Sequence, residues 1–167
     1  TRKAVKWPVD YFVTMLRLTG ASLRTPHRIV VGGSYSDAHS HLALAGQSLL
    51  EPPSVFGWDW DTAWLASSML LARYRMARDV IAALAGGFRP KKLIDTSLTD
   101  PGAIVDAVAR SLGVDDQVSA ADRQAYIDYL TDDGALLTID LKDKDVLSTK
   151  LHGLYGLVMQ SPAFLLH

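Results

Sequence analysis

The sequence predicts an all-α protein, an irregular bundle of about six helices with long ordered loops and at most one small two-stranded element. Two observations lead to this prediction. Apolar residues recur at helical spacing in several segments, and glycine or proline interrupts the pattern between them. In addition, Glu51 is the only glutamate, and aspartate is a better helix cap than a helix-interior residue. We therefore interpret many of the aspartates as helix starts.

The N-terminal segment predicts an amphipathic helix that begins at Pro8, since proline is favoured at the first helical position, and ends near Gly20. Its apolar stripe, at helical spacing, consists of Val9, Phe12, Val13 and Leu16. Thr25-Pro26 then interrupts the pattern. The β-branched run from Ile29 to Val31 predicts a short extended piece.

Two helices joined by a loop are expected next. Residues 36–47 predict a second helix, and residues 51–57 predict an ordered loop, because Pro52-Pro53 removes backbone donors and fixes φ. A long helix follows from about Asp61 to Ala85, and Gly86-Gly87 ends it. The apolar stripe of this helix is Leu65, Met69, Ala72, Met76, Val80 and Leu84.

The second half of the chain predicts three more helices. One is opened by Asp100-Pro101, one by a capping box of Ser119 and Asp122, and the last closes before Pro162. The stripe of the last helix is Leu147, Leu151, Leu154 and Val158. Residues 134–139 are either extended or a loop.

The composition limits the classes of function. The 167 residues predict a single helical domain over residues 1–167, large enough to bury a core. A net charge of -1 offers no field for a polyanion, so nucleic-acid binding is not expected. The absence of cysteine excludes disulfides and thiolate metal sites. No stretch approaches the roughly 18 apolar residues of a membrane span, and the first residues lack a secretory signal.

Several short motifs occur in an order that resembles a known family. They are Lys6-Trp7-Pro8 leading into Phe12-Val13 and Leu16-Arg17; Gly46-Gln47, Pro52-Pro53, Val55, Gly57-Trp58 and Trp64; Leu70-Leu71-Ala72-Arg73; and Met159-Gln160-Ser161-Pro162-Ala163-Phe164. In that order, and across most of the chain, they resemble the C-terminal half of the bacterial domain-of-unknown-function family 1800. The most specific part is the series Gly-Gln, Pro-Pro and Gly-Trp ahead of a helix that bears Leu-Leu-x-Arg.

This resemblance implies a mostly helical protein of several hundred residues, usually exported to the periplasm or the extracellular space and often encoded beside a sulfatase-like partner. It implies no reaction and no cofactor. The chain would then be the C-terminal part of a larger protein, with the N-terminal half removed or present as a separate chain. Two segments depart from the family pattern. Asp59-Trp60-Asp61 stands where the family tends to have a proline and glycines, and residues 24–39 do not align.

The tract from Trp58 to Trp64 predicts a candidate ligand-binding loop, whose residues are Trp58, Asp59, Trp60, Asp61 and Trp64. Exposed indoles could stack on sugar rings while the carboxylates accept hydroxyl hydrogen bonds. In a structural alternative, Trp58 and Trp64 hold the loop against the core, Asp61 caps the long helix, and Trp60 is the exposed ring. Asp59 and Asp61 could also reach the separation of a glycosidase pair, but so could many surface pairs.

Three arginines on the predicted long helix form a second candidate site, an anion-binding surface for a phosphate, a sulfate or an acidic partner. They are Arg73, Arg75 and Arg78. The alternative is structural: Arg75 would pair with Asp79 at i, i+4, and Arg73 would bond carbonyls of the Pro-Pro loop.

The clustered histidines His39 and His41, together with Asp37, are the best available set of metal ligands. On the predicted helix the two imidazoles point about 200° apart, so we expect no metal site. The sequence holds no phosphate-binding loop, nucleophile elbow or zinc-protease motif. An enzyme assignment therefore has no recognisable nucleophile and base to rest on.

The sequence thus leaves the activity unknown. Our first hypothesis is a structural or interaction module of an exported bacterial protein, which docks on its own N-terminal half or a separate chain through an uncovered apolar face of the first or last helix. The alternative is a carbohydrate-binding or carbohydrate-processing protein that uses the Trp58–Trp64 loop. A third hypothesis is a metal-dependent hydrolase on Asp37, His39 and His41.

Overall fold

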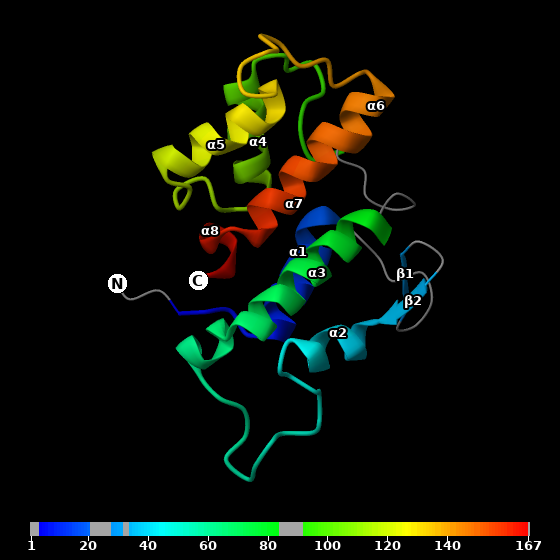
Figure 1. Ribbon diagram of the computed structural model, residues 1–167, viewed down its shortest axis with the longest axis vertical. Helices are drawn as coiled ribbons and strands as arrows, with labels where there is room; N and C mark the ends of the chain where they lie inside the picture. The colour runs from blue at the N-terminus through cyan, green and yellow to red at the C-terminus, as the bar shows by residue number, and fades with distance from the viewer. Residues whose placement is uncertain (1–3, 21–27, 32–33, 84–91, 167) are drawn as a thin grey trace. The chain divides into compact units, whose positions relative to one another are not determined.

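The computed structural model describes residues 4–20, 28–31, 34–83 and 92–166. These residues form an all-α structure with one small antiparallel sheet, which confirms the predicted fold class (Figure 1). The chain divides into two units, residues 1–87 with 165–167 and residues 88–164. None of the described helices combines the length and the apolar character that a membrane-spanning helix requires.

Helix α1 (Pro8–Thr19) begins and ends where the sequence predicts. Pro8 is its first residue, and Gly20 ends it with a φ of 67°, the left-handed conformation that glycine adopts without strain. The predicted apolar stripe is wrong in part, because only Phe12 of its four residues is buried. Tyr11 and Met15 are buried instead, since the set at positions 8, 11, 12 and 15 fits helical spacing equally well.

The predicted helix over residues 61–85 is split into two elements. Asp61–Leu65 form a short 3-10 helix, η1, after which Ala66 adopts an extended conformation and helix α3 (Ser67–Ala83) begins. The predicted start was too early because the chain turns here to bury Trp64. Within α3 the predicted stripe is confirmed in part, since Ala72, Met76 and Val80 are buried while Met69 is only partly buried. The predicted stop at Gly86-Gly87 lies outside the described residues.

Strands β1 (Arg28–Val31) and β2 (Ser34–Asp37) form the antiparallel pair, with Val30 opposite Tyr35. This confirms the extended run that the β-branched residues predict. Helix α2 (Ala38–Leu44) follows β2 directly and packs on α3, as α1 also does. The prediction of a helix over residues 36–47 was too long, because its first two residues belong to β2.

The second unit contains helices α4 (Pro101–Ser111) and α5 (Ala120–Thr131), then the consecutive segments α6 (Lys144–Val146), η4 (Leu147–Leu151) and α7 (His152–Gln160). A short helix, α8 (Pro162–Leu165), follows. The η4 segment is a π-helical turn, so the predicted last helix continues through a local widening rather than as one regular α-helix. Residues 134–139 contain no strand.

Aspartate or serine side chains cap α4, α5 and α6, and the caps of α4 and α5 are those that the sequence predicts. Asp100 Oδ2 accepts a hydrogen bond from Ala103 N at 2.7 Å, and Ser119 Oγ accepts one from Asp122 N at 3.1 Å. Asp143 Oδ1 caps α6 by accepting from the nitrogen of Asp145 at 2.7 Å. The interpretation of aspartates as helix starts is confirmed for Asp100 and Asp143.

The core of the second unit lies where α7 meets α4 and α5. Its fully buried side chains include Ile104, Leu130, Leu151, Leu154 and Tyr155. The Tyr155 hydroxyl is 2.9 Å from Ser111 Oγ, and desolvation by burial raises the pKa of Tyr155 to about 12. This tyrosine is therefore a neutral hydrogen-bonding group that links α7 to α4.

Candidate functional site

The segment between α2 and η1 carries a group of exposed apolar side chains. We call residues 48–60 the apolar loop, and Figure 1 shows it, in teal, projecting between α2 and η1. Leu50, Val55 and Phe56 are 94%, 96% and 93% exposed, and Trp60 is 75% exposed. Single exposed apolar residues are common in proteins, whereas larger contiguous apolar patches occur at interaction surfaces, ligand-binding grooves and aggregation-prone sites.

Local hydrogen bonds order the apolar loop. At its start, the nitrogen of Glu51 donates to Ser48 O at 3.1 Å, and the Ser48 hydroxyl donates to a Glu51 carboxylate oxygen at 2.8 Å. Further along, Gly57 N donates to Ser54 O at 3.0 Å. Pro52-Pro53 restricts φ between these two turns. The exposed side chains are thus presented by a loop of defined shape.

Leu50 adopts a backbone conformation that is unusual for its residue type. Its φ of 68° lies in the left-handed region, where a side chain costs roughly 1–2 kcal/mol relative to the right-handed region. Strain of this kind is found preferentially at binding and catalytic sites. Because Leu50 is also almost fully exposed, no packing of this side chain within the described residues explains the strain.

The start of the apolar loop is fixed to α1. Gln47 is buried, and its Oε1 accepts a hydrogen bond from Val9 N at 2.9 Å. This bond satisfies one of the free amides at the start of α1, where the N-cap residue supplies no side-chain acceptor. Gly46 has a φ of 92°, which strains any residue with a side chain, and a Cβ there would lie 2.8 Å from Met69 Cε, so that Met69 would have to shift. The Gly-Gln motif therefore has a structural role.

The structure separates the tryptophans of the predicted ligand-binding loop. Trp64 is only 1% exposed, while Trp60 lies at the surface, and the Trp7 ring contacts both at centroid distances of 6.1 and 6.0 Å. Trp58 is partly buried, and its Nε1, like that of Trp64, has no hydrogen-bond partner among the described residues. The structural alternative thus describes Trp60 and Trp64 correctly. That alternative did not include Trp7, although its place in the Lys6-Trp7-Pro8 motif could have pointed to it.

The two aspartates of this tract have different environments. Asp59 is exposed beside Trp60. Asp61 has a φ of 48°, and its Oδ1 accepts a hydrogen bond from Val5 N at 3.1 Å. The expectation that Asp61 caps the long helix is wrong, because the helix proper begins at Ser67 and the carboxylate instead holds the N-terminal segment.

The three candidate anion-binding arginines do not form one surface. Arg73 is completely buried, and its guanidinium carbon lies 5.5 Å from the centroid of the Tyr11 ring. Its three side-chain nitrogens have no hydrogen-bond partner among the described residues, so the expected bonds to the Pro-Pro loop are not formed. Desolvation lowers the pKa of the Arg73 guanidinium. Arg75 and Arg78, by contrast, are exposed.

The contacts of the Asp79 carboxylate differ from the predicted ion pair with Arg75. Its two oxygens lie 3.1 Å from Arg78 Nε and 3.5 Å from His41 Nε2. The expected pair with Arg75 is therefore wrong, because a neighbouring residue and a histidine from α2 reach the carboxylate instead. His39 is exposed and has a ring nitrogen 3.5 Å from Ser48 Oγ, so the two histidines make different contacts. No group of three metal-ligating side chains occurs among the described residues.

Comparison with known proteins agrees with the motif order. A family described as protein of unknown function (DUF1800) matches residues 1–166. No curated protein and no solved structure matches the chain significantly. The family match spans nearly the whole sequence, including the Gly-Gln and Pro-Pro motifs that hold and shape the apolar loop. The chain therefore belongs to the DUF1800 family, whose description assigns no activity.

Proposed function

We propose that this chain is an interaction module that docks through the apolar loop, and that its partner is the N-terminal half of the same family protein. The observation that supports the proposal is the near-complete exposure of Leu50, Val55 and Phe56 on one ordered loop. The expected uncovered face lay on the first or last helix, but Val13 on α1 and Leu157 on α7 are each only partly exposed. An exported location is part of the proposal and rests on the family alone.

The free energy of association favours a partner that belongs to the same polypeptide. Burial of three large apolar side chains contributes roughly 5–9 kcal/mol before other terms. Association of two free proteins costs a comparable amount, estimated at about 4–15 kcal/mol. A partner in the same polypeptide avoids much of this cost through its high effective concentration. The local order of the loop reduces the cost further, because little conformational freedom remains to be lost.

The double substitution Val55→Ser with Phe56→Ser tests the proposal. We expect it to weaken binding of the separately expressed N-terminal half at least about a hundredfold, measured by isothermal titration calorimetry. Because both side chains are exposed, the thermal midpoint of the chain itself should change little. The matched control is Leu137→Ser, which replaces an 87% exposed leucine in the second unit and should leave the affinity unchanged.

Three outcomes would contradict this proposal. One is equal binding by the double variant and the wild type, and another is the absence of binding to the N-terminal half even at millimolar concentration, about the effective concentration that a short flexible linker supplies. The third concerns the sulfatase-like partner that the family suggests. If that protein, and not the N-terminal half, binds in a manner that depends on Val55 and Phe56, the loop is a docking site but the proposed partner is wrong.

A second candidate function, carbohydrate binding, is favoured by one observation. Trp60 presents an exposed indole that can stack on a sugar ring, and its neighbour in the sequence, Asp59, has an exposed carboxylate that can accept hydroxyl hydrogen bonds. If this function is correct, oligosaccharides should shift the tryptophan emission of the wild type, and Trp60→Ala should abolish the shift. An unchanged spectrum with every sugar of a varied panel would exclude it, and that result would leave the docking proposal intact.

A further inference from the structure

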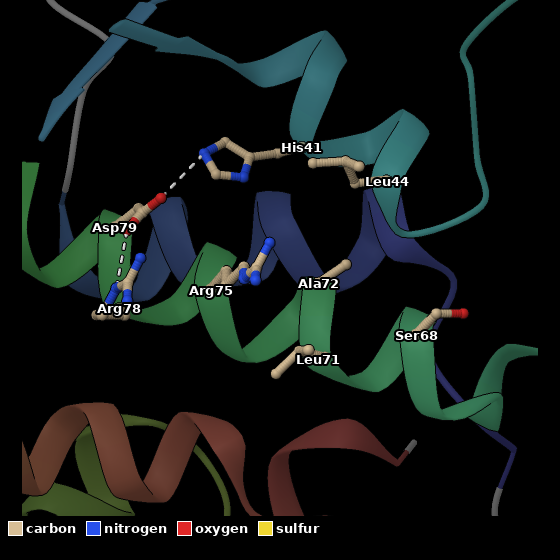
Figure 2. A pocket seen from close by; sticks show the side chains of 8 residues that line it. All are labelled: His41, Leu44, Ser68, Leu71, Ala72, Arg75, Arg78 and Asp79. Atoms are coloured by element: carbon tan, nitrogen blue, oxygen red, sulfur yellow. Dashed lines mark hydrogen bonds and ion pairs between the residues drawn. The ribbon is translucent and has the colours of Figure 1, made fainter. Parts of the chain in front are cut away.

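A pocket of about 550 Å³ lies between α2 and α3, and none of its lining residues belongs to the apolar loop. Figure 2 shows His41 and Leu44 on α2, opposite several side chains of α3. The lining residues used below are His41, Leu44, Leu71, Arg75, Arg78 and Asp79. This volume is in the range of pockets that bind small molecules, roughly 300–1,000 Å³.

Among the described residues, one cationic side chain of the pocket has no ion-pair partner. Asp79 is buried, and its carboxylate is already shared between Arg78 and His41, as the dashed lines in Figure 2 mark. Arg75 forms no ion pair or hydrogen bond among the described residues, and its side chain lines the same pocket. Two arginines and one aspartate give the lining a formal charge of +1 when the histidine is neutral. A monoanion complements this charge.

The remaining wall of the pocket is aliphatic. Leu44 and Leu71 line it and are 61% and 52% exposed, so each retains apolar surface that a ligand can cover. A guanidinium binds planar carboxylates through two parallel hydrogen bonds. A pocket lined by both arginine and leucine side chains suits a ligand whose acidic group is attached to a hydrocarbon body, rather than a small inorganic anion.

We propose that the pocket between α2 and α3 binds a carboxylate carried on an apolar body, with Arg75 as the partner of the carboxylate and Leu44 as part of the apolar wall. The site is independent of the docking proposal, since it uses other residues and a different chemistry. The carboxylate can come from a free organic acid or from the C-terminus of a peptide that ends in an apolar residue.

The test is a nuclear magnetic resonance titration of the ¹⁵N-labelled chain with octanoate below its micellar concentration. Saturable shifts are expected in amides of α2 and α3. Arg75→Gln should weaken octanoate binding about tenfold or more, because it removes a charge-assisted pair. The matched control is Arg17→Gln, an exposed arginine on α1 that does not line the pocket. This control should bind octanoate as the wild type does.

Further measurements test the acidic group and the hydrocarbon body of the ligand one at a time. Leu44→Ser should weaken binding of octanoate but not of acetate, and neutral octanol and inorganic sulfate should each bind more weakly than octanoate. A peptide that ends in leucine, compared with its C-terminal amide, distinguishes a peptide source from a free acid. The proposal is overturned if octanoate causes no shifts in α2 and α3, if Arg75→Gln has no effect, or if octanol binds as well as octanoate.

Discussion

Replacement of Trp64 by alanine is expected to lower the free energy of unfolding of the first unit by about 3–5 kcal/mol. Trp64 is 1% exposed, its ring contacts Trp7, and it lies 3.2 Å from the position of a Cβ on Gly46. Truncation therefore removes buried apolar area and leaves a cavity beside Trp7 and Gly46. Urea denaturation followed by far-ultraviolet circular dichroism measures the loss.

Trp60→Ala is the matched comparison, because it removes the same side chain four residues earlier. Trp60 is mostly exposed, so its truncation should cost no more than about 1 kcal/mol. All four tryptophans lie within residues 1–87, and selectively excited tryptophan fluorescence therefore reports the unfolding of the first unit. Equal losses for the two variants would contradict the assignment of Trp64 to the core and Trp60 to the surface.

The helices could be predicted because their signals are local. Pro8 at a first helical position, Gly20 at a C-cap and the Asp100 cap each act through backbone geometry within one turn of helix. The break at Ala66 could not be predicted in this way. The break depends on the burial of Trp64 in the core. Helical spacing alone cannot show that this burial stabilises the fold more than a continuous helix would.

The candidate site was harder to predict, because its features depend on contacts between distant segments. Leu50, Val55 and Phe56 are residue types that are usually buried in a protein core. Only the folded structure shows that they are exposed. Similarly, the spacing of Arg75 and Asp79 predicts an ion pair on an isolated helix. His41 from α2 reaches that carboxylate instead, and this leaves Arg75 available in the pocket.

Replacement of Arg73 by methionine is expected to stabilise the first unit by about 1–4 kcal/mol. The guanidinium is completely buried and unpaired among the described residues, and such desolvation costs several kcal/mol. Its position over the Tyr11 ring recovers only about 0.5–2 kcal/mol. Methionine is unbranched, of similar length and uncharged, so it can fill the space without this cost. The urea midpoint from tryptophan fluorescence measures the change.

Arg17→Met is the control for Arg73→Met, since Arg17 is exposed on α1 and its replacement should shift the midpoint little. A loss of 3–5 kcal/mol in Arg73→Met would contradict the prediction, because a loss of that size is typical of breaking a buried ion pair.

The expected gain in stability would also bear on the role of Arg73. If removal of Arg73 stabilises the fold, this side chain contributes something other than stability. Arg73→Met should then be assayed for binding of the N-terminal half, alongside the apolar-loop variants.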